Sequence, residues 1–123
     1  IFAAVIGYTE IVELVNNAVA EWDKKNFSGK TPFMFAVKKG KEDIVKILID
    51  NGAKLDEQDS NGDTALLFAA ETGYKDIVEL LINAGAELDK KNFSGKTALM
   101  FAIEKNKEDI ATLLTDKGAK LIV

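Results

Sequence analysis

A period of 33 residues runs through the chain and constrains its fold more than any other feature of the sequence. Five positions of this period return unchanged in three consecutive copies: Gly29, Gly62 and Gly95; Thr31, Thr64 and Thr97; Ala36, Ala69 and Ala102; Ile44, Ile77 and Ile110; Gly52, Gly85 and Gly118. Periods of about 20 to 50 residues indicate repeat proteins, whose units must stack to complete a core. We therefore expect one domain, with repeats at 27–59, 60–92 and 93–123 and an incomplete leading repeat at 1–26.

Each repeat is predicted to contain two helices separated by a glycine. The threonine of the period, Thr31 in the first full repeat, can cap the first helix, and Pro32 follows at the position where a missing N–H costs nothing. In the second helix, apolar residues recur at a spacing that buries one side: Ile44, Val45, Leu48 and Ile49. Gly52 then follows the second helix, at the position where a helix commonly ends in a residue with left-handed geometry. These patterns predict helical hairpins.

The repeats resemble a known family in specific residues. Residues 29–37 read Gly-Lys-Thr-Pro-Phe-Met-Phe-Ala-Val, and residues 43–53 read Asp-Ile-Val-Lys-Ile-Leu-Ile-Asp-Asn-Gly-Ala. This looks like the ankyrin repeat pattern G-x-T-P-L-H-x-A-A, then I-V-x-L-L-x-x-G-A-D, and residues 62–86 and 95–119 match it equally well. The resemblance implies an all-α solenoid of stacked helix-turn-helix units, whose connections project as β-turn or hairpin fingers beside a concave face.

Within the three full repeats, the chain departs from the family pattern at two kinds of position. The histidine of the pattern is replaced by an apolar residue in all three repeats: Met34, Leu67 and Met100. Asn106 stands where the other repeats have Gly40 and Gly73, and asparagine also tolerates left-handed geometry. Neither departure changes the expected fold.

A second periodicity has twice the length of the repeat. Residues 24–30 read Lys-Lys-Asn-Phe-Ser-Gly-Lys and recur letter for letter at 90–96, whereas residues 57–63 between them read Glu-Gln-Asp-Ser-Asn-Gly-Asp. The repeats therefore alternate as pairs. Duplication of a block of two repeats, or deliberate construction, explains this more simply than independent selection of the same seven residues.

Composition excludes several classes of function. The chain has no cysteine and no histidine, which removes thiolate chemistry, the usual general base and the commonest metal ligands. All 16 basic residues are lysine and the net charge is −4, a balance that argues against nucleic acid. The apolar run at 98–103 is far shorter than the ~18 residues of a membrane span. We expect no enzyme, no cofactor and no bound metal, in a cytoplasmic protein that contacts neither nucleic acid nor membrane.

Two motifs resemble ligand-binding loops but lack an essential residue. Residues 29–31 match the end of a phosphate-binding P-loop, but its first glycine is replaced by Lys24. Residues 57–62 resemble the start of a calcium loop, but Phe68 occupies the position of its final glutamate. Both segments are better interpreted as solvated turns.

The remaining hypothesis is that the chain is a protein-interaction module, which binds a protein partner of unknown identity on the concave face. If the resemblance holds, this face consists of the finger tips and the ends of the first helices. The tips contribute Phe27, Ser28, Lys30, Ser60, Asn61, Asp63, Phe93, Ser94 and Lys96. The helix ends contribute Val5, Ile6, Lys38, Lys39, Glu71, Thr72, Glu104 and Lys105.

Phe27 and Phe93 are the strongest candidates for binding anchors, because an aromatic residue on a solvated turn has no core to enter. The alternative, which the sequence leaves equally open, is that each ring folds back over the neighbouring tip. A rival function is a structural or designed scaffold that spaces domains or self-associates end to end. The apolar residues at 1–2 and 121–123 suggest poorly capped ends, which we interpret as those of a fragment of a longer array.

Overall fold

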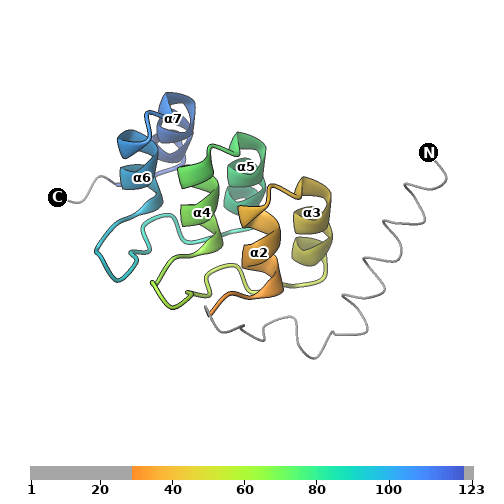
Figure 1. Cartoon of the computed structure of the whole chain (residues 1–123). Coiled ribbons are helices and arrows are strands. Elements are labelled where there is room, and N and C mark those ends of the chain that lie inside the picture. The colour runs from red at the N-terminus through yellow and green to blue at the C-terminus, as the bar shows by residue number, and fades with distance from the viewer. Residues whose placement is uncertain (1–28, 121–123) are drawn as a thin grey trace.

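In a computed structural model, which describes residues 29–120, three helical hairpins stack side by side. The first helices of the repeats are α2 (Pro32–Lys38), α4 (Ala65–Thr72) and α6 (Ala98–Glu104). The second helices are α3 (Glu42–Asp50), α5 (Lys75–Asn83) and α7 (Glu108–Asp116). Figure 1 shows the first helices as one layer and the second helices as another behind it. The predicted all-α solenoid is confirmed for this part of the chain, which contains no strand.

The first helices begin at the threonines that recur every 33 residues. The hydroxyl of Thr31 accepts a hydrogen bond from the Met34 backbone nitrogen at 3.2 Å, and Pro32 follows in the first turn. Thr64 and Thr97 cap α4 and α6 in the same way, at 3.4 and 3.3 Å. Each cap satisfies an N–H that has no partner inside the helix. The sequence therefore sets where each hairpin starts.

The second helices end in a left-handed glycine. After α3, Gly52 has a φ of +85°, and the next residue, Ala53, donates its N–H to the Leu48 carbonyl at 3.0 Å. This six-to-one bond closes the helix end and turns the chain toward the next finger. After a first helix, α6, Asn106 also takes a positive φ, +58°, as predicted for a residue that replaces Gly40 and Gly73.

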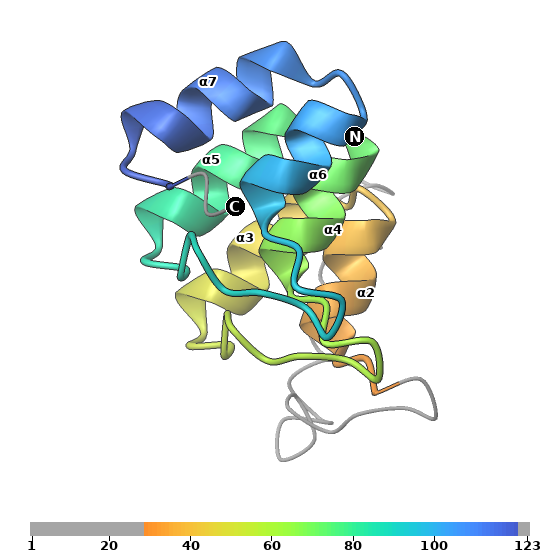
Figure 2. The same ribbon diagram turned by 90° about the vertical axis from the view of Figure 1, so that its left-hand side faces the viewer.

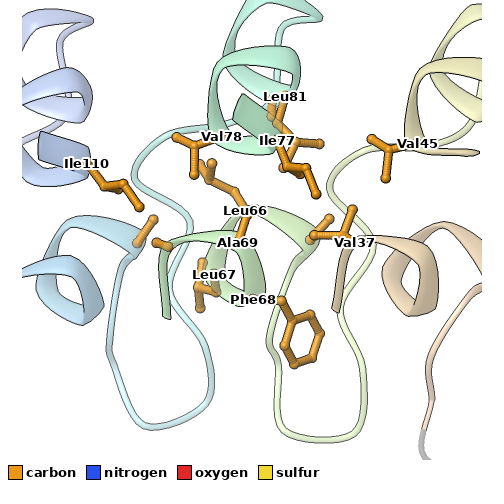
Figure 3. Close-up of a cluster of buried hydrophobic side chains, with 14 of the residues drawn as sticks. Val37, Val45, Leu66, Leu67, Phe68, Ala69, Ile77, Val78, Leu81 and Ile110 are labelled. Atoms are coloured by element: carbon orange, nitrogen blue, oxygen red, sulfur yellow. The ribbon is translucent and has the colours of Figure 1, made fainter. Parts of the chain in front are cut away.

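The core lies between the two layers and continues from one hairpin to the next. Figure 3 shows Leu66 of α4 directed toward Ile77, Val78 and Leu81 of α5, and all four are buried. Val37 and Ile110 belong to the same buried cluster and come from the two outer hairpins. No single repeat could bury these side chains alone, so the stack itself completes the core.

The connections between hairpins project from one end of the first helices. Figure 2 shows the fingers extending to the same side of the stack, beyond the starts of α4 and α6. The leading repeat predicted at 1–26, the residues 27–28 and the segment 121–123 lie outside the described residues, so the predicted repeat boundaries remain predictions there.

Candidate functional site

Each described finger is a tight turn closed by its own backbone. In the second finger, residues 57–63, Gly62 donates its N–H to the Asp59 carbonyl at 2.9 Å, and Asp59 donates its N–H to the Asp63 carbonyl at 3.0 Å. The third finger, residues 90–96, has the same two hydrogen bonds: Gly95 donates to the Asn92 carbonyl, and Asn92 donates to the Lys96 carbonyl. The predicted β-turn tips are therefore present, and each holds its tip residues in a fixed shape.

Neighbouring fingers are also bonded to each other. Phe93 donates its N–H to the Asn61 carbonyl at 3.0 Å. The Gln58 side-chain amide donates to the Lys91 carbonyl at 2.9 Å and to the Gly62 carbonyl of its own finger at 2.8 Å. These bonds tie the second finger to the third, so the two tips form one preorganised surface.

Phe93 is the most exposed large apolar residue among those described, with 72% of its surface accessible. One part of the ring lies against the neighbouring finger, because a β-carbon placed on Gly62 would be 2.7 Å from Phe93 Cδ1. Both alternatives from the sequence thus hold in part: the ring rests on the adjacent tip, and most of it still faces outward. Phe27 and Ser28 lie outside the described residues.

The other predicted tip residues differ in exposure and in the contacts that they make. Ser60, Asn61 and Ser94 are exposed. Lys30 is occupied: its ammonium group lies 3.3 Å from Asp59 Oδ2 and its side chain is only 13% exposed. Asp63 is half-buried and accepts a hydrogen bond from the Asn92 amide at 2.9 Å.

Lys96 is half-buried and pairs at 3.0 Å with a glutamate of its own repeat, Glu104. The salt bridge links the third finger to the end of α6. Both side chains keep 40% or more of their surface accessible, so this pair remains within reach of a partner.

The predicted residues at the ends of the first helices lie mostly open. Five of them are exposed and Glu71 is half-buried; the exposed ones are Lys38, Lys39, Thr72, Glu104 and Lys105. The hydroxyl of Thr72 donates to the Phe68 carbonyl at 2.7 Å, so its polar group is already engaged. Val5 and Ile6 lie outside the described residues. The basic end of α2 and the acidic Glu71 give neighbouring repeats opposite charge.

A column of phenylalanines on the first helices was not among the predicted residues. Phe35, Phe68 and Phe101 occupy one position of the repeat, and lysine ammonium groups lie over their rings. Lys30 and Lys38 lie 5.4 and 5.8 Å from the centroid of Phe68, close enough for cation–π attraction. In Figure 3 Phe68 points toward the finger side of α4. The 33-residue recurrence of phenylalanine was the signal that could have identified this column.

The three rings differ in exposure. Phe68 is 8% exposed, whereas Phe35 is 48% exposed and borders a hollow of about 560 Å³ with Pro32, Lys39 and Ile44. The lysines that cover Phe68 belong to the preceding hairpin, so packing between hairpins buries this ring. The exposed part of the column is therefore Phe35 and, to a lesser degree, Phe101.

Neither a metal site nor a membrane span is found in the described region. Residues 29–120 contain no cluster of three or more acidic side chains placed to hold a metal ion. None of their helices is both long enough and apolar enough to cross a membrane.

Comparison with known families agrees with the fold and with the fingers. A family model for ankyrin repeats, in three copies, matches residues 1–92 and 52–123. The chain therefore belongs to the ankyrin repeat family, whose members serve generally as protein–protein interaction modules and are typically not enzymes. No curated protein matches the chain.

Proposed function

We propose that this chain binds a protein partner across the finger tips and the C-terminal ends of the first helices, with Phe93 as the central anchor. The observation that carries this proposal is the combination of exposure and rigidity at Phe93. Its ring is 72% exposed, yet its backbone N–H is hydrogen-bonded to the Asn61 carbonyl on the preceding finger. A large aromatic side chain held in this way loses little conformational entropy on binding, which favours its use as an anchor.

The residues around Phe93 suit the rim of an interface. Ser60, Asn61 and Ser94 offer hydrogen bonds beside the ring, and the Lys96–Glu104 pair offers both signs of charge on the same repeat. A polar, partly charged rim around an aromatic centre is the usual arrangement in protein interfaces. The alternation of charge along the surface would orient a partner of mixed charge.

The test is to identify the captured partner and then measure its affinity for two variants. Partners are first captured on the immobilised chain and identified by mass spectrometry. Titration calorimetry with the purified partner then compares the wild-type chain with Phe93→Ala. We expect an affinity loss of about 30-fold or more, which is typical of a hot spot.

Lys46→Ala is the control, because Lys46 is exposed but lies on α3, in the layer of second helices and outside the proposed interface. Unchanged affinity in Phe93→Ala, or an equal loss in Lys46→Ala, would contradict the assignment of Phe93 as the anchor. Circular dichroism should show that both variants keep their helices.

A second candidate function, a self-associating scaffold, is favoured by one observation. Ile103 is 50% exposed, whereas the corresponding residues of the other hairpins, Val37 and Ala70, are fully buried. Ile103 borders a hollow of about 430 Å³ with Leu99 and Thr112, formed by α6 and α7 of the last described hairpin. If copies associate through this face, sedimentation velocity will show concentration-dependent oligomers that Ile103→Asp abolishes; a monomer at all concentrations would exclude this function.

A further inference from the structure

The alternation of finger sequences has a counterpart in the contacts between fingers. Two finger positions alternate along the chain. In sequence, the position that forms the turn base in the described fingers is Asn26, Asp59 or Asn92, and the position four residues later is Lys30, Asp63 or Lys96. In the described fingers, the later residue of one finger meets the base residue of the next, as Lys30 with Asp59 and Asp63 with Asn92.

Both kinds of base residue use one side-chain oxygen in the same way. Asp59 Oδ1 accepts hydrogen bonds from the backbone nitrogens of Asn61 and Asp63 at 2.9 and 3.0 Å. Asn92 Oδ1 accepts from the nitrogens of Ser94 and Lys96, both at 2.9 Å. Aspartate and asparagine therefore build the same turn, and this requirement fixes which side-chain atom remains to face the preceding finger.

The remaining atom has opposite hydrogen-bonding character in the two residues. In Asp59 it is Oδ2, an acceptor, and it lies 3.3 Å from Lys30 Nζ in an ion pair. In Asn92 it is Nδ2, a donor, and it donates to Asp63 Oδ1 at 2.9 Å. Lys30 can only donate and the Asp63 carboxylate can only accept, so each finger presents the group that its neighbour needs.

Burial makes the Lys30–Asp59 pairing the more consequential of the two, since Asp63 and Asn92 are only half-buried. The Asp59 side chain is fully buried and that of Lys30 is 13% exposed, so water cannot replace a lost partner. A buried polar group that faces a group of its own kind loses its hydrogen bond and keeps its desolvation cost.

We propose that this pair is a donor–acceptor code that determines which finger can stack on which. If an acidic finger followed another acidic finger, a carboxylate like that of Asp63 would face one like that of Asp59. If a lysine finger followed another lysine finger, an ammonium group like that of Lys30 would face the Asn92 amide donor. Only alternation sets a cation or an N–H donor against each acidic acceptor: Asp59 Oδ2 has no hydrogen-bond partner among the described residues and relies on its ion pair with Lys30.

The code matters because the helices alone do not specify the order of the repeats. The positions that form the hairpins, such as the capping threonines and the core alanines, are the same in all three repeats. A stack that skipped one repeat would therefore preserve most of the core but would place the Lys30 ammonium group against the Asn92 amide donor. The code penalises such a misalignment and thereby favours the native register of the stack.

The test is a pair of double-mutant cycles on the full chain, measured by urea unfolding. Asn92→Asp should place a carboxylate against Asp63, and Asp63→Lys should place an ammonium group against the Asn92 amide. Each single change should raise the unfolding equilibrium constant about tenfold or more. The double variant recreates the Lys30–Asp59 arrangement and should return to within about threefold of wild type, a coupling of tenfold or more.

The second cycle reverses the first. Asp59→Asn and Lys30→Asp should each destabilise the chain, and together they recreate the Asp63–Asn92 arrangement. This cycle keeps the proposal testable if Asn92→Asp fails to fold, because it changes a different pair of fingers. Folding of the Asp63→Lys, Asn92→Asp double variant where the single variant fails would itself support the code.

Asn61→Asp is the matched control, since it makes the same chemical change on an exposed finger residue. It should leave the unfolding constant within about twofold of wild type. Additive losses in both double variants, or a loss in Asn61→Asp as large as that in Asn92→Asp, would overturn the proposal.

Discussion

A β-carbon placed on Gly62 would lie 2.6 Å from the backbone nitrogen of Phe93 on the next finger, and Gly62 has a φ of +80°. A side chain at this position would therefore meet two free-energy costs, that of left-handed backbone geometry and that of crowding against Phe93. Gly52 also has a positive φ, +85°, but nothing lies within 4 Å of a β-carbon there. The two glycines separate the cost of left-handed geometry from the cost of crowding between fingers.

We expect Gly52→Ala to lower the free energy of unfolding by about 1 kcal/mol, the cost of left-handed geometry alone. Gly62→Ala should lower it by about 3 kcal/mol, because the alanine also pushes the two fingers apart. Urea unfolding of both variants measures the difference. Equal losses would mean that the contact between Gly62 and Phe93 is not a tight one.

Two lysines at the same position of the repeat should differ in their contribution to stability. Lys30 pairs with the buried Asp59, so Lys30→Met should leave a buried carboxylate without its cation and cost about 3 kcal/mol. Lys96 pairs with Glu104 where both side chains are at least 40% exposed, so Lys96→Met should cost less than about 1 kcal/mol. Chemical denaturation of the two variants tests this order, and a larger loss for Lys96→Met would contradict it.

The fold was predictable because its determinants are local and recur. Thr64 caps α4 through a residue three positions away, and Gly52 ends α3 through bonds to the last turn of that helix. Such contacts depend on short sequence separations, and the 33-residue period shows each of them three times. The period also gave the order of the hairpins.

The candidate surface was less predictable because its character depends on contacts between repeats. Lys30 was expected to be an open tip residue, but its exposure is set by Asp59 on the next finger. Phe68 is buried by lysines of the preceding hairpin, although Phe35 occupies the same position of the repeat and is 48% exposed. These outcomes require the relative placement of neighbouring repeats, which a sequence period does not specify in atomic detail.

The capping role of the buried threonines can be separated from their packing. Thr64 is 1% exposed and its hydroxyl accepts from the Leu67 nitrogen at 3.4 Å. Thr64→Val keeps the volume but removes the acceptor, so we expect a loss of about 1.5 kcal/mol. Thr64→Ser keeps the acceptor and should lose less. Urea unfolding compares the two, and a larger loss in the serine variant would assign the role of Thr64 to packing instead.

Asn106 offers a position where a substitution should stabilise the chain. It has a φ of +58°, the only positive φ of a non-glycine residue among those described, and the other repeats use Gly40 and Gly73 at this position. Asn106→Gly removes the β-carbon that left-handed geometry disfavours, so we expect a gain of about 0.5 kcal/mol and a higher melting temperature. Lys105→Gly is the control, because Lys105 has a φ of −92° and a glycine there only adds freedom to the unfolded chain. That variant should lose stability by about the same amount. Stabilisation by both glycines, or by neither, would show that the backbone at Asn106 is not strained.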